Sequence, residues 1–79
     1  MANLYSGKID TNGEYADIET LTGLTLTAGT TYTIQVIDDA WVREGETGLG
    51  FHVSSHPFNF EADVDALYIK GDCLLNIAD

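Results

Sequence analysis

The chain has 79 residues, which is enough for one small domain and too few for a second core or a separate cofactor domain. Thirteen acidic residues stand against three basic ones, and the formal net charge of −10 argues against nucleic-acid binding, which needs clustered Lys and Arg. The same charge disfavours docking on an anionic membrane surface.

The first part of the chain contains two weak strand candidates around one turn. Residues 4–9 and 15–21 carry short runs of apolar side chains. Between them, Asn12-Gly13 is the strongest hairpin dipeptide of the sequence, because both residues tolerate a positive φ. We therefore expect a hairpin turn at this dipeptide with a strand on each side.

Residues 24–36 give the clearest strand signal. Apolar and polar side chains alternate on both sides of Ala28-Gly29, and a period of two predicts strands with one buried and one solvated face. Gly29 is suited to a positive φ, so the two strands are expected to form an antiparallel hairpin. The apolar members of the pattern are Leu24, Leu26, Tyr32, Ile34 and Val36.

A glycine-rich, charged loop at residues 43–48 separates the next two strand candidates, which lie at 40–42 and 50–53. Trp41 is adjacent to Val42 in the first of them. Phe51 alternates with Val53 in the second. Both aromatic side chains are therefore expected to pack inward.

The last part of the chain contains three more short strand candidates. Residues 58–60 precede an acidic turn at 61–65, and residues 67–70 and 74–77 flank Gly71-Asp72, which is another hairpin signal. No segment repeats apolar residues with helical spacing for long enough to predict a helix.

Seven or eight short strands at spacings of about ten residues predict an all-β domain. We expect a compact antiparallel β-sandwich or small barrel, jelly-roll or immunoglobulin-like, in a single domain over residues 1–79. The single cysteine, Cys73, cannot form an internal disulfide, so the domain lacks the crosslink common in small secreted proteins. The expected core contains Leu24, Leu26, Tyr32, Ile34, Val36, Val53, Leu67 and Ile69.

One group of residues has the chemistry of a zinc site. His52 and His56 stand four apart, and Cys73 is a third potential ligand. A structural zinc site needs four ligands and usually a close pair of cysteines. Solvent-facing or hydrogen-bonded histidines are therefore favoured over a zinc site.

A second group has the chemistry of a calcium site. Glu61, Asp63 and Asp65 alternate like the first ligands of a calcium loop, and Asp38-Asp39 is another acidic pair. The residues that follow Asp65 lack the glycine and the final glutamate of such a loop. A solvated acidic turn is favoured, and no metal is expected.

The sequence provides no catalytic constellation. Ser55 and His56 are adjacent, so on a strand they point to opposite faces and cannot form a dyad. A glycosidase-type carboxylate pair would need a cleft that raises the pKa of one acid. We therefore assign no catalytic, cofactor-binding or metal-binding residue, and we expect no cofactor.

Aromatic side chains are the remaining candidates for ligand contact. A small sandwich needs most of them in its core. An exposed Trp41 with a second coplanar ring beside it would favour carbohydrate binding. The aromatic residues are Tyr5, Tyr15, Tyr32, Trp41, Phe51, Phe58, Phe60 and Tyr68.

Several segments between residues 18 and 78 resemble small all-β virion proteins of tailed phages and prophages, of the head-decoration, head-fibre or tail-associated type. The resemblance is carried by LTLTAGTTYTIQV at 24–36, Pro57-Phe58, LYIK at 67–70 and LLNIA at 74–78. The same text is similar to bacterial immunoglobulin-like and jelly-roll modules of cell-surface and secreted proteins. The resemblance to virion proteins implies a structural protein and transfers no catalytic or binding residue.

These observations predict a non-enzymatic structural protein of a phage particle that forms a homo-oligomer and contacts other virion proteins, with no nucleic-acid or membrane partner. The N-terminal MANLYSGK lacks the layout of a signal peptide, so synthesis in the bacterial cytoplasm and location in the virion are expected. The alternative is a small ligand-binding module for carbohydrate or calcium, and a small hydrolase is a third hypothesis.

Overall fold

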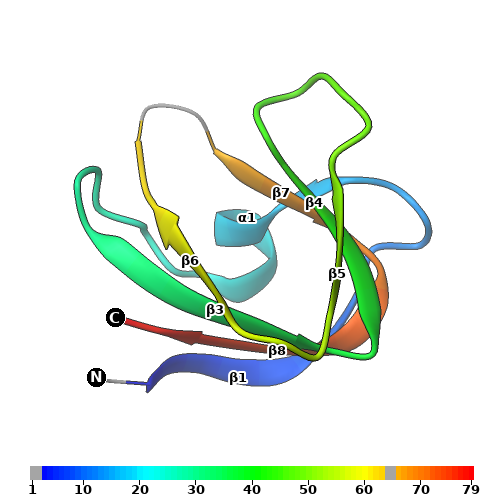
Figure 1. Ribbon diagram of the computed structural model, residues 1–79, viewed down its shortest axis with the longest axis horizontal. Coiled ribbons are helices and arrows are strands. Elements are labelled where there is room, and N and C mark those ends of the chain that lie inside the picture. The colour runs from blue at the N-terminus through cyan, green and yellow to red at the C-terminus, as the bar shows by residue number, and fades with distance from the viewer. Residues whose placement is uncertain (1–2, 64–65) are drawn as a thin grey trace.

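The computed structural model describes residues 3–63 and 66–79, which form an all-β domain (Figure 1). Eight strands and one short helix occur in these residues, and the predicted antiparallel sandwich is confirmed. In chain order the elements are β1 (Asn3–Asp10), β2 (Ala16–Asp17), α1 (Ile18–Thr22), β3 (Thr31–Ile37), β4 (Asp39–Glu44), β5 (Phe51–Ser54), β6 (Phe58–Glu61), β7 (Leu67–Lys70) and β8 (Asp72–Ala78).

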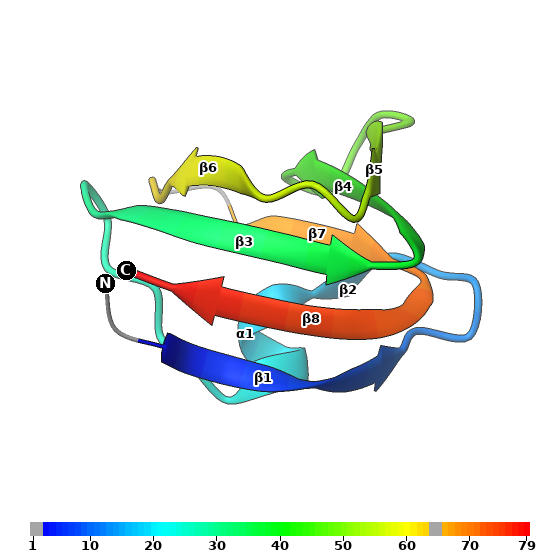
Figure 2. The same cartoon turned by 60° about the horizontal axis from the view of Figure 1, so that its bottom comes forward.

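The strands form two four-stranded antiparallel sheets. Sheet A has the order β1-β8-β3-β6, and sheet B has the order β2-β7-β4-β5. Within the described residues, β4 and β5 are the one pair of consecutive strands that lie side by side, and each other connection leads from one sheet to the other (Figure 2). Each sheet is therefore assembled from segments that are far apart in the sequence.

This topology corrects two predicted hairpins. Asn12 and Gly13 do form a turn with positive φ values of 56° and 80°. However, β1 before the turn pairs with β8, and β2 after it pairs with β7. Gly71-Asp72 likewise joins β7 of sheet B to β8 of sheet A. The turn residues indicate where the chain reverses, but they do not say whether it returns to the same sheet.

The hairpin predicted around Ala28-Gly29 is also wrong, because residues 24–27 lie outside any strand. Gly29 has the expected positive φ, 87°. Its backbone N–H donates to the carbonyl of Ala62 at 2.8 Å. The turn therefore rests against the segment that follows β6.

Side chains take the place of a partner strand beside residues 24–27. The N–H of Leu26 donates to Glu19 Oε2 at 2.7 Å, and the N–H of Thr27 donates to the Tyr32 hydroxyl at 2.8 Å. Leu24 and Leu26 are half-buried against the core. The alternating pattern thus reports a half-buried segment correctly, although its backbone is irregular.

The weak strand candidate at residues 15–21 is divided between β2 and α1, so the expectation of no helix was wrong for five residues. Asp17 caps the helix, accepting at Oδ1 from the N–H of Glu19 at 2.9 Å, and Gly23 ends it with φ 77°. A single helical turn is too short to show apolar periodicity. In the described part of the chain, no helix has the length and apolar character needed to span a membrane.

The core lies between the two sheets. Ile34, Ile69, Leu75 and Ile77 are fully buried, and they come from the inner strands β3, β7 and β8. The predicted core residues Tyr32, Ile34, Val36, Leu67 and Ile69 are buried, whereas Leu24, Leu26 and Val53 are half-buried. The core also contains Ile9, Ile18, Ala40, Val42, Phe60, Ala62, Cys73, Leu75 and Ile77.

Thr11 and Gly71 tie two of the connections between the sheets together. The N–H of Thr11 donates to the Gly71 carbonyl at 3.1 Å, and the N–H of Gly71 donates to Thr11 Oγ1 at 2.9 Å. Thr11 is buried, so its hydroxyl depends on this partner. A Cβ at position 71 would lie 2.9 Å from the Asp39 carbonyl oxygen and 3.1 Å from the Cβ of Ala40. The close approach to β4 therefore requires glycine at this position.

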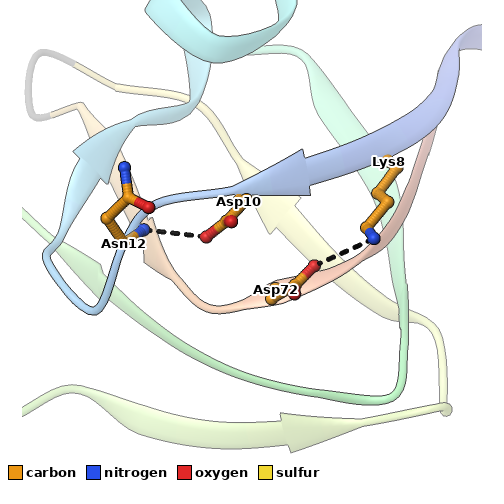
Figure 3. A network of polar contacts seen from close by, with 4 residues as sticks. All are labelled: Lys8, Asp10, Asn12 and Asp72. Atoms are coloured by element: carbon orange, nitrogen blue, oxygen red, sulfur yellow. Dashed lines mark hydrogen bonds and ion pairs between the residues drawn. The ribbon is translucent and has the colours of Figure 1, made fainter.

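Two like charges face each other next to this corner. Asp10 and Asp72 are direct partners across β1 and β8, an arrangement that costs stability. Figure 3 shows that each carboxylate has its own contact: Asp10 Oδ1 accepts from the N–H of Asn12 at 2.9 Å, and Asp72 lies 3.6 Å from Lys8 Nζ. These exposed contacts each contribute little energy, but they offset the repulsion at the corner.

Thr11→Val should lower the free energy of unfolding by about 1–3 kcal/mol, because the isosteric side chain leaves the Gly71 N–H without its acceptor. Thr31→Val, at an exposed position of β3, should change it by less than about 0.5 kcal/mol. Urea denaturation followed by circular dichroism measures both values. Equal stability of the two variants would contradict the role given to the Thr11–Gly71 pair.

Candidate functional site

The outer surface of sheet B gathers aromatic and charged side chains in adjacent rows. The register pairs Trp41 with Lys70 and Arg43 with Tyr68 across β4 and β7, and it pairs Trp41 with His52 across β4 and β5. These residues alternate with buried ones along their strands, so their side chains point away from the core. We call this surface the aromatic face; it consists of Tyr15, Asp17, Asp39, Trp41, Arg43, His52, Tyr68 and Lys70.

Arg43 occupies the middle of the aromatic face. Its guanidinium carbon lies 4.0 Å from the centroid of the Tyr15 ring and 5.8 Å from that of Tyr68, within the range of cation–π attraction. Nη1 donates to the Gly48 carbonyl at 2.9 Å. Nε is buried and has no hydrogen-bond partner among the described residues. Arg43 therefore connects the sheet to the β4–β5 loop.

Tyr15 holds the other end of the same loop. Its hydroxyl donates to the carbonyl of Leu49 at 2.5 Å. Gly50 has φ 80°, and a Cβ there would meet the Tyr15 hydroxyl and lie 2.6 Å from the Val42 carbonyl oxygen. Tyr15 thus holds the loop against the sheet, and glycine at position 50 leaves room for its hydroxyl group.

Trp41 is the exposed ring of the aromatic face, at 41% exposure, so the expectation that it packs inward was wrong. The alternation of β4 places Ala40 and Val42 inside and Trp41 outside. The ring of His52 lies 5.3 Å from that of Trp41 and is tilted by 57°. The two rings are not coplanar, so Trp41 and His52 do not form a flat two-ring stacking platform.

Charged groups of both signs surround Trp41. Lys70 Nζ lies 6.0 Å from the centroid of the Trp41 ring and 4.9 Å from that of Tyr15. His52 Nε2 lies 3.1 Å from Asp39 Oδ1. Arg43 and Lys70 are two of the three basic residues of the sequence. The aromatic face therefore holds most of the positive charge of an acidic protein, next to carboxylates.

Tyr68 belongs to the same polar arrangement. Its hydroxyl donates to Glu46 Oε1 at 3.3 Å. Desolvation and then the negative charge of Glu46 raise the pKa of Tyr68 above its ordinary value. A raised pKa favours the protonated phenol, which is the form that donates to Glu46.

A second feature is a groove of about 740 Å³ at the side of the sandwich where the two sheets end in β5 and β6. Its buried apolar lining consists of Val42, Phe60 and Leu67. The β4–β5 loop and β5 provide the outer part, where Leu49 is 89% exposed and Phe51 is 77% exposed. We call this feature the β5–β6 groove. The expectation that Phe51 is packed in the core was wrong, because it lies on an edge strand where the inner face opens into the groove.

The potential zinc ligands predicted from sequence occupy different environments. His52 is on the aromatic face, and His56 is exposed between β5 and β6. Cys73 is buried in the core on β8. Ser55 has a positive φ, 57°, and lies with His56 in a connection between strands, so these two residues do not alternate on a strand as assumed.

The acidic candidates are separated as well. Glu61 ends β6, Asp63 is exposed after it, and Asp65 lies outside the described residues. Asp38 has φ 86° where β3 passes to β4, and Asp39 lies beside His52. Among the residues that the structure describes, no group of three or more His, Cys, Asp or Glu side chains is placed to hold a metal ion.

Sequence reasoning missed both features for identifiable reasons. The aromatic face combines Tyr15 with residues from four strands whose pairing follows no simple pattern in the sequence. The β5–β6 groove has one sequence signal, since Leu49 stands between two glycines within a polar loop, where an apolar side chain has little to pack against.

Comparisons with protein-family models, with curated proteins and with solved structures found no match to this chain.

Two glycine substitutions should separate the effect of backbone conformation from that of the close contacts with Tyr15 and Val42. Gly48→Ala, with φ 102° and open space around it, should cost about 1–2 kcal/mol of stability. Gly50→Ala should cost at least about 1 kcal/mol more, because its Cβ meets Tyr15 and the Val42 carbonyl. Chemical denaturation compares them, and equal losses would show that Tyr15 does not constrain the loop.

Cys73 should make stability fall at alkaline pH. Burial, followed by the charges of Asp72 and Asp38, raises the pKa of this thiol. Above the unfolded pKa of about 8.5, the unfolded chain releases a proton that the native state retains, so the free energy of unfolding decreases as pH rises. The stability difference between the parent protein and Cys73→Ala should therefore shrink between about pH 8 and pH 10. A constant difference across that range would contradict this assignment.

Proposed function

We propose that the protein is a non-enzymatic structural subunit of a phage particle, and that two copies associate through the β5–β6 groove. The phage assignment is supported by the resemblance of segments between residues 18 and 78 to small virion proteins. The assembly assignment is supported by the exposure of Leu49 and Phe51 beside an apolar groove. Large apolar side chains exposed together are typical of a contact surface.

A second copy fits this groove because the surface carries both a projection and a hollow. Leu49 and Phe51 are largely exposed at the outer part of the groove, and Val42, Phe60 and Leu67 form its buried lining. In a contact with twofold symmetry, the same patch of each copy meets the other, so a patch with both shapes is complementary to itself. Each copy would insert its projecting side chains into the groove of its partner.

Association would also increase the buried surface of a protein whose core is small. A domain of this size buries only about 60% of the surface that its unfolded chain exposes, so burial between copies adds to stability. The net charge of −10 opposes the contact. Salt screens that repulsion over about 8–10 Å, whereas apolar burial is not screened.

The proposed role needs no catalytic group. The two histidines lie in exposed positions, His52 beside Asp39 and His56 between strands, and Cys73 is buried with a raised pKa. A thiol in this environment stays protonated and is a poor nucleophile at neutral pH. The exposed apolar side chains of the β5–β6 groove instead support assembly as the function of this protein.

Sedimentation velocity over a range of protein and sodium chloride concentrations tests the assembly. The dimer should strengthen as salt rises, because the repulsion between acidic copies is screened. Phe51→Ser should weaken it by at least about tenfold, since Phe51 is the largest exposed apolar side chain of the groove lining.

Leu74→Ser is the matched control, because Leu74 is an exposed apolar residue of β8 outside the groove lining. It should leave the dimer unchanged. A monomer under all conditions, or equal effects of the two variants, would refute assembly through the groove. Dissociation on adding salt would show that ion pairs hold the contact instead.

Mass spectrometry of purified particles released from cells that carry the gene tests the phage assignment. We expect the protein to copurify with capsid or tail proteins in many copies per particle. Its absence from such particles, with the protein present in the cells, would refute a virion role even if the dimer forms.

A further inference from the structure

Trp41 offers a small apolar surface that the proposed dimer does not use. It is exposed on the aromatic face, whereas Tyr15 and Tyr68 beside it are half-buried and lie near the guanidinium of Arg43. A stable protein–protein contact buries about 800 Å² on each partner, centred on several apolar anchors. One exposed indole matches a ligand about the size of a single ring.

The groups around Trp41 indicate a ligand without net charge. Lys70 provides an ammonium donor that lies over the indole, 6.0 Å from its centroid. Asp39 provides a carboxylate acceptor, and His52, which lies next to it, can donate or accept. An anion would be repelled by Asp39 and a cation by Lys70. A ligand whose hydroxyl groups both donate and accept can use every one of these groups.

We propose that Trp41, Lys70, Asp39 and His52 bind a neutral saccharide, with one pyranose ring stacked on the indole. A pyranose with equatorial hydroxyls has C–H groups on its ring face, and these carry slight positive charge that is attracted to the electron-rich face of an indole. Its hydroxyls project from the edge of the sugar ring, where they can reach the Lys70 ammonium group, which lies over the indole, and the Asp39 carboxylate beside His52. β-1,4-linked glucose has this geometry in every unit.

The geometry also limits the site to one stacked sugar. The His52 ring is tilted by 57° to Trp41, so it cannot continue a flat stack and instead borders the indole at one side. Lys70 lies 4.9 Å from the Tyr15 ring, which keeps its ammonium group near the site without removing its donors. Affinity should therefore be weak and should change little once the oligosaccharide is longer than the few units that contact the face.

Cellohexaose is the probe, and Trp41 itself is the reporter, because it is the single tryptophan of the chain. We expect a saturable change in tryptophan fluorescence at concentrations up to about 10 mM, which corresponds to weak binding. Isothermal titration calorimetry follows Trp41→Ala, which should abolish binding while circular dichroism shows an intact fold.

Two lysine variants separate a local contact from a general charge effect. Lys70→Gln should weaken binding by at least about fivefold, because it removes a charged donor beside the ring. Lys8→Gln changes the net charge equally but lies next to Asp72 on sheet A, so binding should change by less than about twofold. Equal effects of the two variants would overturn the proposed site.

Three other results would also overturn the saccharide proposal. The first is no binding of cellohexaose up to about 10 mM. The second is tighter binding of oligogalacturonate, which would show that the face selects anions. The third is loss of the dimer in Trp41→Ala, which would make this face a protein interface. Loss of the dimer in Phe51→Ser with sugar binding retained would leave the saccharide site standing and confirm that the two surfaces are separate.

Discussion

The reciprocal hydrogen bonds between Thr11 and Gly71 join two places where the chain leaves one sheet for the other. The first connection leads from β1 to β2, and the second leads from β7 to β8. Because β1 pairs with β8 and β2 pairs with β7, one fixed corner sets a strand register in both sheets. It also places Tyr15, which follows the first connection, beside Lys70, which precedes the second. The arrangement of the aromatic face thus depends on a contact between residues 60 positions apart in the sequence.

The fold class was predictable because apolar and polar residues alternate in any strand that has one buried face. Tyr32, Ile34 and Val36 follow that pattern and are buried in β3. The partners of the strands were not predictable in the same way. Asn12-Gly13 and Gly71-Asp72 have the local conformational freedom of hairpin turns, yet both lie between sheets. Turn chemistry acts over a few residues, whereas the choice of sheet depends on the packing of the whole core.

Neither the aromatic face nor the β5–β6 groove could be predicted from residues that are neighbours in the sequence. Trp41 was assigned to the interior because it is large and apolar, but its place in the alternation of β4 makes it face outward. Phe51 faces inward by the same alternation, yet it remains exposed because β5 is the last strand of its sheet. Whether a large apolar side chain is covered depends on whether another strand lies beyond it. The strand order determines this, and the alternation of apolar and polar residues does not.

The two sides of the sandwich where the edge strands lie differ in what covers the core. Beside the edge strands β1 and β2, the chain adds α1, which buries Ile18, and residues 23–26, which bring Leu24 and Leu26 against the core. Beside the edge strands β5 and β6, the chain passes through a short connection and leaves the β5–β6 groove. The side that carries a helix is completed within one molecule. The other side has the apolar lining of an interior, and it is the side through which we propose that a second copy associates.

The position of β8 determines when this molecule can become folded. Although β8 is the last strand in the sequence, it lies in the interior of sheet A between β1 and β3, and its Leu75 and Ile77 are fully buried. During synthesis, β1 and β3 emerge from the ribosome without the strand that must stand between them. Sheet A therefore closes only after β8 has emerged. Until then the edges of β1 and β3 that β8 covers are unpaired, and the net charge of −10 opposes their association with other copies.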